Sequence, residues 1–161
     1  MSAALVPLQN LTLGSAQATV TFASIPGTFR DLRLVVNGAT SAEGNIFIRV
    51  NSDSGSNYYS VNMRGSGGGT QSSTQTTTRI NSNFSTGLQT SSRAVNSYDI
   101  MDYAQTDKHK TVLVRANHSD EVDAIAARWA STSAITSIAI TANDTTTFTA
   151  GSTFALYGVL A

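Results

Sequence analysis

The chain has 161 residues, of which 40% are hydrophobic and only 12% are charged, and its ten basic side chains balance ten acidic ones. A single domain of this length buries enough surface to fold without a disulfide or metal staple. The zero net charge excludes the large basic surface on which nucleic-acid binding depends, and the absence of an apolar run of about 20 residues excludes a membrane-spanning helix. We therefore expect neither nucleic acid nor membrane as a partner.

Residue types that build strands dominate the composition. Cysteine is absent, which excludes disulfides, thiolate-bound zinc and cysteine nucleophiles. Serine and threonine make up about a quarter of the chain, and hydroxyl side chains mixed with β-branched and aromatic residues favour strands over helices. Short alternating segments separated by Gly, Asn, Asp and Ser recur along the whole sequence, which is typical of a β-sandwich or barrel. The predicted fold class is all-β, with two packed antiparallel sheets.

The first 17 residues are predicted to be distinct from a sandwich domain of residues 18–161. The opening MSAALVPLQN lacks the basic region and the apolar run of a secretory signal, so we do not expect export by that route. Residues 1–17 are rich in Leu and Val, and we interpret them either as an edge strand or as an arm that docks on a neighbouring subunit. Pro7 has no backbone N–H and confines any strand here to a sheet edge.

Ten strands are predicted after this segment. The alternation is clearest in IFIRVN, where Ile46, Ile48 and Val50 point to one face and Phe47 and Arg49 point to the other. One face of each strand is expected to be core. The predicted strands span residues 18–24, 31–36, 46–51, 58–64, 77–81, 96–103, 111–117, 124–130, 135–142 and 153–159.

Two segments are less regular than these strands. The stretch GSGGGTQSSTQTTT, residues 65–78, is predicted to be a mobile connecting loop, because burial cannot repay the entropy of fixing a chain of glycine and hydroxyl residues. Residues 122–129 fit the i, i+3, i+4, i+7 spacing of a short helix. Since Ile125, Ala127 and Trp129 also alternate, we prefer a strand for this second segment.

The stretch NSDSGSNYYS, residues 51–60, has oxygen-bearing side chains at alternate positions, as a calcium-binding loop does. Asn51 and Asp53 fill positions 1 and 3, but Gly55 occupies position 5 and Asn62 stands where such a loop needs a bidentate glutamate. A single carboxylate binds a divalent ion poorly. We interpret the segment as a turn that returns one strand into the next, with Gly55 free to take a positive φ, and we predict no metal site.

Titratable residues do not form a catalytic pattern. His109 and His118 flank the predicted strand 111–117, about 25–30 Å apart at ~3.3 Å per residue, so they cannot share a metal ion. Asp99 and Asp102 differ by an odd number of positions and project to opposite faces of a regular strand, which excludes a glycosidase pair. The sequence contains no G-x-S-x-G, Walker A or G-x-G-x-x-G motif. We predict no catalytic, cofactor-binding or metal-binding residues, and not an enzyme.

Two further groups of side chains have structural interpretations. Asp120, Glu121 and Asp123 are predicted to form a solvated acidic tip, with calcium binding as the alternative. The aromatic residues could stack on sugar rings, but on sandwiches such residues are more often core or rim. We therefore expect structural roles for Tyr58, Tyr59, Tyr98, Tyr103, Tyr157 and Trp129.

The stretch AITSIAITANDTTTFTAGSTFALYGV carries the most specific pattern in the chain. Its I-T-S-I-x-I run, polar loop and F-x-x-G-S-x-F-x-L-Y-G ending resemble the end of jelly-roll virion proteins of tailed bacteriophages. FRDLRLVVNG resembles the second strand of that family. IRVNSDSGSNYYSVNMRG resembles its pattern of a strand, an N-x-D-x-G-x-N-Y turn and a following strand. The resemblance covers residues 18–159.

This resemblance implies a jelly-roll fold and a structural role in the virus particle, with the turn residues belonging to the framework. The leading hypothesis is a capsid decoration or cement protein that binds between capsomers and stabilises the head. Its partners would be the major capsid protein and copies of itself, for example in a homotrimer. It would be made in the bacterial cytoplasm and lie on the capsid surface, with contacts through the N-terminal segment and the loops at one end. The alternative is a tail or tail-fibre module that binds host-surface glycan through exposed tyrosines and residues 65–78.

Overall fold

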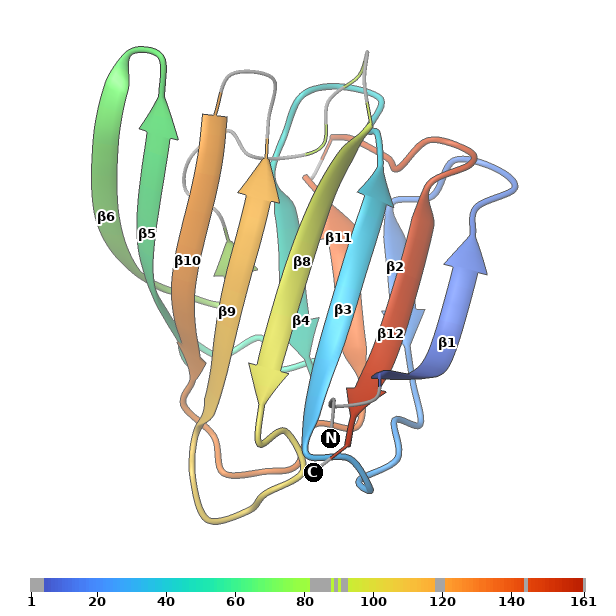
Figure 1. The fold of residues 1–161 in the computed structure, drawn as a ribbon, viewed down its shortest axis with the longest axis vertical. Coiled ribbons are helices and arrows are strands. Elements are labelled where there is room, and N and C mark those ends of the chain that lie inside the picture. The colour runs from blue at the N-terminus through green and yellow to red at the C-terminus, as the bar shows by residue number, and fades with distance from the viewer. Residues whose placement is uncertain are drawn as a thin grey trace.

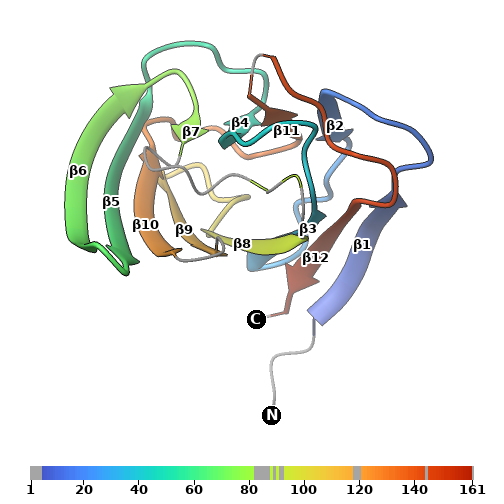
Figure 2. The same ribbon diagram turned by 90° about the horizontal axis from the view of Figure 1, so that it is seen from above.

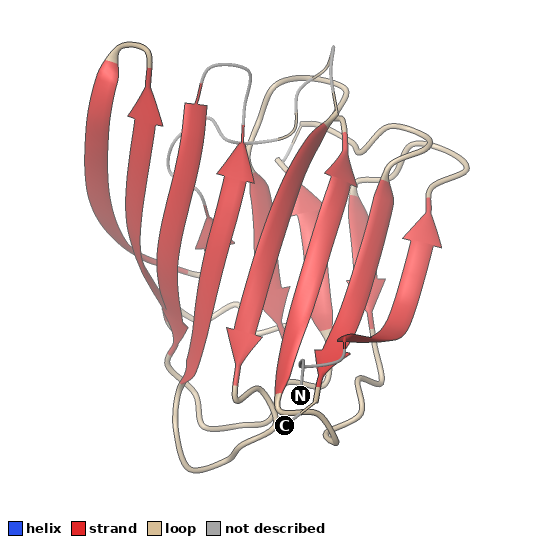
Figure 3. Cartoon of the chain, viewed as in Figure 1, coloured by secondary structure: helices blue, strands red, loops and turns tan. Residues whose placement is uncertain are grey.

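Every regular element in the described part of the chain is a β-strand. The computed structural model describes residues 5–81, 88, 90, 93–117, 121–143 and 145–160. Within these residues there are twelve strands and no helix (Figure 3), and hence no helix long and apolar enough to cross a membrane. The strands are β1 Leu5–Thr12, β2 Thr19–Phe22, β3 Asp31–Gly38, β4 Ile46–Val50, β5 Tyr58–Ser66, β6 Gly69–Thr77, β7 Ile80–Asn81, β8 Ala94–Met101, β9 Lys110–Asn117, β10 Glu121–Trp129, β11 Ile138–Ala142 and β12 Thr153–Val159.

The strands form two antiparallel sheets that pack face to face. The larger sheet has eight strands in the order β1-β12-β3-β8-β9-β10-β5-β6, and the smaller has four in the order β2-β11-β4-β7. Figure 1 shows the larger sheet in front of the smaller one, and Figure 2 shows it curving around the smaller sheet from β6 to β1. This arrangement confirms the predicted two-sheet antiparallel β-sandwich.

The chain passes back and forth between the sheets in the manner of a jelly roll. β2, β4, β7 and β11 belong to the smaller sheet, and the strand that follows each of them, β3, β5, β8 or β12, belongs to the larger. The strands β8, β9 and β10 form a meander between β3 and β5 in the larger sheet. This meander widens the larger sheet, and β12 and β1 extend it further on the other side of β3.

Alternate side chains fill the space between the sheets. On β3, Leu34 and Val36 are fully buried and lie opposite Leu156 and Phe154 of β12. The Phe154 ring meets Phe148 edge-on, with centroids 4.9 Å apart and planes at 81°. Full burial of one such side chain contributes about 1.5–3 kcal/mol, so this layer supplies most of the favourable free energy of folding.

The alternation predicted for β4 is confirmed. Ile46, Ile48 and Val50 are buried in the core between the sheets. Phe47 is buried as well, although it lies on the opposite face of the strand. The Arg79 guanidinium lies over the Phe47 ring, 3.4 Å from its centroid, and so shields from water a ring that the sheet itself leaves uncovered.

The described part of the N-terminal segment is an edge strand. β1 pairs antiparallel with β12, from Leu5 opposite Val159 onward, and lies at the outer edge of the larger sheet. The register shifts between Pro7 and Gln9. Such a bulge accommodates Pro7, because proline has no backbone N–H and is not tolerated in central strands.

The segment that we expected to be a mobile loop is mostly strand. β6, Gly69–Thr77, pairs with β5 along its whole length. The expectation was wrong because backbone hydrogen bonds to β5, together with threonine residues that favour extended backbone, offset an entropy cost that burial alone does not cover. The other ambiguous segment is strand β10, which confirms the preference for strand over helix.

Gly158 is a glycine that the packing requires. It lies on the core face of β12, and a Cβ built at this position would overlap the ring of Phe29. Phe29 packs against the edge of the core. The overlap involves the ring atom nearest the backbone, which the side chain cannot easily move.

We therefore expect Gly158→Ala to lower the free energy of unfolding by about 1–3 kcal/mol, the usual cost of overpacking a core. Urea unfolding followed by circular dichroism measures this change. Gly67→Ala is the matched control, because a Cβ there meets nothing within 4 Å, and it should change stability by less than about 0.5 kcal/mol. Equal effects of the two substitutions would contradict the packing argument.

Candidate functional site

The outer face of the larger sheet carries an exposed apolar surface. Because side chains alternate along a strand, the residues between the buried ones of β5, β9 and β10 point away from the smaller sheet. Val122 is 64% exposed and Met63 is 53% exposed. The surface, here named the outer-face patch, consists of Val61, Met63, Leu113, Val122, Ala124 and Ala126.

Strand pairing brings the residues of the outer-face patch side by side. On β10, Ala124 lies opposite Met63 of β5, and Ala126 lies opposite Val61 of β5 and Leu113 of β9. The small alanine side chains form a floor between larger neighbours. Two shallow grooves, of about 550 and 750 Å³, run over this part of the sheet, with walls from β5 and β6.

Polar and charged side chains frame the patch. The Arg128 guanidinium lies 4.5 Å from the centroid of the Tyr59 ring. On β3 and β8, Arg33 Nε donates to Asp99 Oδ1 at 2.6 Å, and this hydrogen bond raises the pKa of Arg33. β6 adds a row of exposed hydroxyl groups. An apolar centre inside a polar rim is the composition of a protein–protein interface.

The aromatic residues offer little to a sugar ligand. Sugar stacking requires an exposed ring face, and among the aromatic residues named from the sequence Tyr59 is the most exposed, at 39%. Arg128 covers one face of that ring. Tyr157 is half-buried. The predicted core role is confirmed for Tyr58, Tyr98, Tyr103 and Trp129.

The outer-face patch is not among the sites predicted from the sequence, although β10 carries a signal for it. Ile125 and Trp129 face the core, but Val122 and Ala126 on the opposite face are apolar too. A strand of an antiparallel sheet with one face in water normally alternates apolar and polar residues. The outer face of β10 departs from this pattern at Val122, Ala124 and Ala126, which are all exposed and apolar.

Residues 51–57 form a hydrogen-bonded turn, as interpreted from the sequence. The Asp53 carboxylate accepts hydrogen bonds from Trp129 Nε1 at 2.6 Å, Asn57 Nδ2 at 2.9 Å and the Gly55 backbone N–H at 2.8 Å. These bonds, the one from Trp129 foremost, lower the pKa of Asp53. Both carboxylate oxygens face N–H donors, which suits a structural role and not a cation.

Two details of the predicted turn are wrong. β4 and β5 belong to different sheets, so the segment crosses the sandwich and does not return one strand into its neighbour. The positive φ angles occur at Asn51 (50°) and Ser52 (55°), not at Gly55. Asn51 can adopt this conformation because its Oδ1 accepts the backbone N–H groups of Thr136 and Ser137 at 2.8 and 3.1 Å.

The predicted acidic tip is also wrong where the structure describes it. Glu121 and Asp123 are only 9% and 5% exposed, because they lie on the same inward face of β10 as Ile125. Glu121 forms an ion pair with Arg64 of β5, which offsets part of the cost of burying its charge. Asp120 lies outside the described residues.

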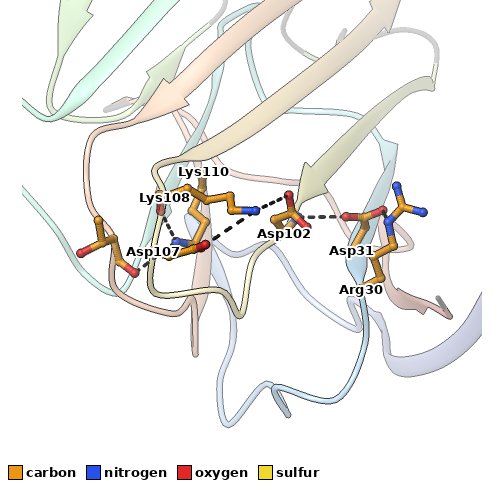
Figure 4. Close-up of polar contacts among 7 residues, drawn as sticks. Arg30, Asp31, Asp102, Asp107, Lys108 and Lys110 are labelled. Carbon is orange, nitrogen blue, oxygen red and sulfur yellow. Dashed lines mark hydrogen bonds and ion pairs between the residues drawn. The ribbon is translucent and has the colours of Figure 1, made fainter.

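The remaining titratable candidates lie apart from one another. His109 is exposed just before β9, and His118 lies outside the described residues. Asp99 is on the outer face of β8, whereas Asp102 lies in the turn after β8, 3.6 Å from Lys108 Nζ (Figure 4). In the part of the chain that the structure describes, no three His, Cys, Asp or Glu side chains gather where they could hold a metal ion.

A buried lysine lies at the same end of the sandwich. Lys110 is fully buried, and its Nζ donates to the backbone carbonyls of Lys108 at 2.8 Å and Thr132 at 3.3 Å (Figure 4). Burial lowers the pKa of Lys110. The two carbonyls belong to the loops before β9 and after β10, so this side chain holds the loops together.

The comparisons with known proteins identify no family for this chain. No family model and no curated protein matches the chain. Similar solved structures include the galectin LEC-6 of Caenorhabditis elegans. It is 15% identical to this chain and has a TM-score of 0.38, and the match covers 94% of this chain and 96% of the galectin chain. Another is the alginate lyase Aly36B in complex with alginate tetrasaccharide, which is 9% identical to this chain and has a TM-score of 0.29. This match covers 88% of this chain and 79% of the lyase chain. At these scores the similarity carries no argument about function.

The hydrogen bonds of Asp53 give a prediction about pH. Because the folded-state pKa is lowered, the carboxylate stabilises the fold above its unfolded pKa of about 3.9, and this contribution is lost as pH falls through the folded-state value. At pH 7, Asp53→Asn should lower the free energy of unfolding by about 1–2 kcal/mol. The difference from wild type should shrink below about pH 4.

Urea unfolding at several pH values, followed by the fluorescence of Trp129, measures this difference, since Trp129 is the single tryptophan of the chain. Asp107→Asn is the control, because the Asp107 side chain is 72% exposed. It should change stability by less than about 0.5 kcal/mol at every pH. A difference for Asp53→Asn that stays constant down to pH 2 would show that ionisation of Asp53 does not matter.

Proposed function

We propose that this chain is a structural protein of a bacteriophage particle, and specifically a capsid decoration protein that binds between capsomers and stabilises the head. Two independent features support the proposal. The sequence of residues 18–159 resembles jelly-roll virion proteins of tailed bacteriophages. The outer-face patch presents apolar side chains on a broad, shallow surface, and this observation carries the proposal because such surfaces mark contacts with other proteins.

The patch explains how binding would stabilise a shell. Burial of apolar surface contributes roughly 25 cal/mol per Å², and a decoration protein that spans two capsomers adds this free energy to the closed shell. On the β6 side, the surface around the patch is rich in hydroxyl groups and carries no charged side chain. Hydroxyl groups can bond to a neighbouring protein without the large cost of desolvating a charge, so the rim can be buried too.

We place the main contact on the outer-face patch, with the N-terminal segment as a secondary contact. Most of the described N-terminal segment is already paired with β12 as strand β1, so it does not extend as a free arm. Leu5 and Leu11 of β1 remain exposed, at 45% and 39%. They can add apolar contact at the edge of the sheet but do not form a continuous surface with the patch, which lies on β5, β9 and β10.

The tail-module alternative has less support. It was based on exposed tyrosines and on a flexible segment of residues 65–78 that could drape over a glycan. Most of the tyrosines are buried, and most of that segment is strand β6. We therefore keep head decoration as the proposal and make the tail location an outcome of its test.

The test uses virions that lack the chain, to which purified protein is added back. We expect wild-type protein to bind to the head and to raise the temperature at which the shell opens. Val122→Glu should weaken binding by at least tenfold, because a charge would be buried in the contact. The variant should still fold, because Val122 is exposed in the free chain. Binding is measured by cosedimentation, and shell opening by release of DNA on heating.

Thr21→Glu is the matched control, because Thr21 is an exposed strand residue on the outer face of the smaller sheet. It should bind as the wild type does. Binding to tails, or equal binding by the Val122→Glu and wild-type proteins, would overturn the proposal.

A further inference from the structure

Strand β6 forms one edge of the larger sheet and lacks the features by which edge strands avoid pairing with other chains. Those features are charged side chains, proline, bulges and short length. The nine residues of β6, GTQSSTQTT, contain no charge and no proline. Among the other described sheet edges, β1 has Pro7 and a bulge, β2 has four residues and β7 has two.

The pairing of β5 shows which backbone groups of β6 are free. The Ala130 N–H donates to the Asn57 carbonyl at 2.8 Å. This bond lies beside the pair Tyr58 and Trp129, so Tyr58 and every second residue after it turn their backbone groups toward β6. Because Tyr58 pairs with Thr77, the odd-numbered residues of β6 bond to β5. The N–H and C=O groups directed to the open edge belong to Thr70, Ser72, Thr74 and Thr76.

The side chains of these four residues are also accessible. All four are exposed, and they lie on the outer face beside the β5 residues of the outer-face patch. No described strand lies beyond β6 (Figure 1). The edge therefore offers both backbone hydrogen bonds and polar side chains to a strand that approaches it.

We propose that two copies of this chain pair through β6, antiparallel and around a two-fold axis at Ser73, so that two larger sheets join into one. In this register Thr70 lies opposite Thr76 of the second copy, and Ser72 lies opposite Thr74 of the second copy. Each free N–H then meets a free carbonyl, because the groups that face outward on one copy align with those on the other. This proposal goes beyond the decoration function and does not rest on it.

The composition of β6 identifies the occupant as a second copy. Self-pairing places like residues across the seam, which is destabilising when they are charged and favourable when they are threonine and serine. A two-fold interface requires a self-complementary surface, and β6 carries nearly the same residue types on both sides of Ser73: threonine and serine at the free positions and glutamine at positions 71 and 75.

The two-fold arrangement also places the two outer-face patches on the same side of the joined sheet. The axis is perpendicular to the sheet, so both outer faces point in one direction. Val61 and Met63 of each copy are then one strand away from the seam, since they lie opposite Thr74 and Ser72. A dimer would present two patches to one partner surface, and two linked contacts bind more tightly than either alone.

The dimer should be weak and dependent on concentration. A seam between two strands buries less than the ~800 Å² per partner of a standard interface, and each backbone hydrogen bond adds little net free energy, because it replaces hydrogen bonds to water. We therefore expect dissociation constants in the micromolar range or weaker. Sedimentation equilibrium of the purified chain alone, at loadings from micromolar to near millimolar, should show a monomer–dimer equilibrium.

The decisive variant is Thr74→Pro. It removes an N–H that faces the open edge while leaving the bonds to β5 intact, and proline is tolerated at such edge positions. Because Thr74 contributes to the seam twice in a two-fold dimer, we expect dimerisation to weaken by about tenfold or more. Thr74→Val keeps the backbone N–H and should dimerise within about threefold of the wild type.

Amide hydrogen exchange of the wild type provides a readout that needs no variant. On raising the concentration, protection should increase at Ser72 and Thr74, and it should not change at residues that already bond to β5. A monomer at all concentrations, a dimer that Thr74→Pro leaves unchanged, or new protection confined to other strands would each overturn the proposal. Failure of capsid binding would not, because the measurements use the isolated chain.

Discussion

Burial of alternate side chains between two sheets is the constraint on which the rest of the structure depends. It fixes the register of every strand, because a slip by one residue would turn the whole apolar set of that strand to the other face. The fully buried Leu34, Val36, Leu156 and Phe154 meet across β3 and β12 for this reason. The same constraint determines what lies on the outside, since each buried residue is flanked by two outward ones.

The outward residues of the larger sheet include both charged and apolar side chains. On β3 and β8 they include the ion pair of Arg33 and Asp99, whose charged groups are hydrated at the surface. On β5, β9 and β10 they form the outer-face patch, where Val122 and Met63 remain more than half exposed. Folding of the isolated chain gains nothing from this exposure. Our proposed function assigns this exposed apolar surface to a contact with another protein, and its shallow shape and polar rim support that proposal.

Sequence patterns predicted the sandwich because period-two alternation reports directly on one buried face. They also predicted a turn after β4, and in the structure the Asp53 carboxylate holds that turn by accepting three N–H donors. The sequence predictions failed where a residue's structure depends on a contact with a segment that is distant in the sequence. β6 has the composition of a loop, but its pairing with β5 makes it a strand. Glu121 has the sequence context of a solvated residue, but the alternation of side chains along β10 turns it inward, where it pairs with Arg64. The outer-face patch is assembled from three strands, so no single segment reveals its extent.

We propose that the outer face of β5, β9 and β10 binds another protein of the virus particle. The most direct measurement is a cryo-electron microscopy map of the intact virion in which this chain can be traced. We expect density on the head, with Val122 and Met63 packed against the capsid protein. A map that places the chain elsewhere, or on the head with this face turned toward solvent, would contradict it.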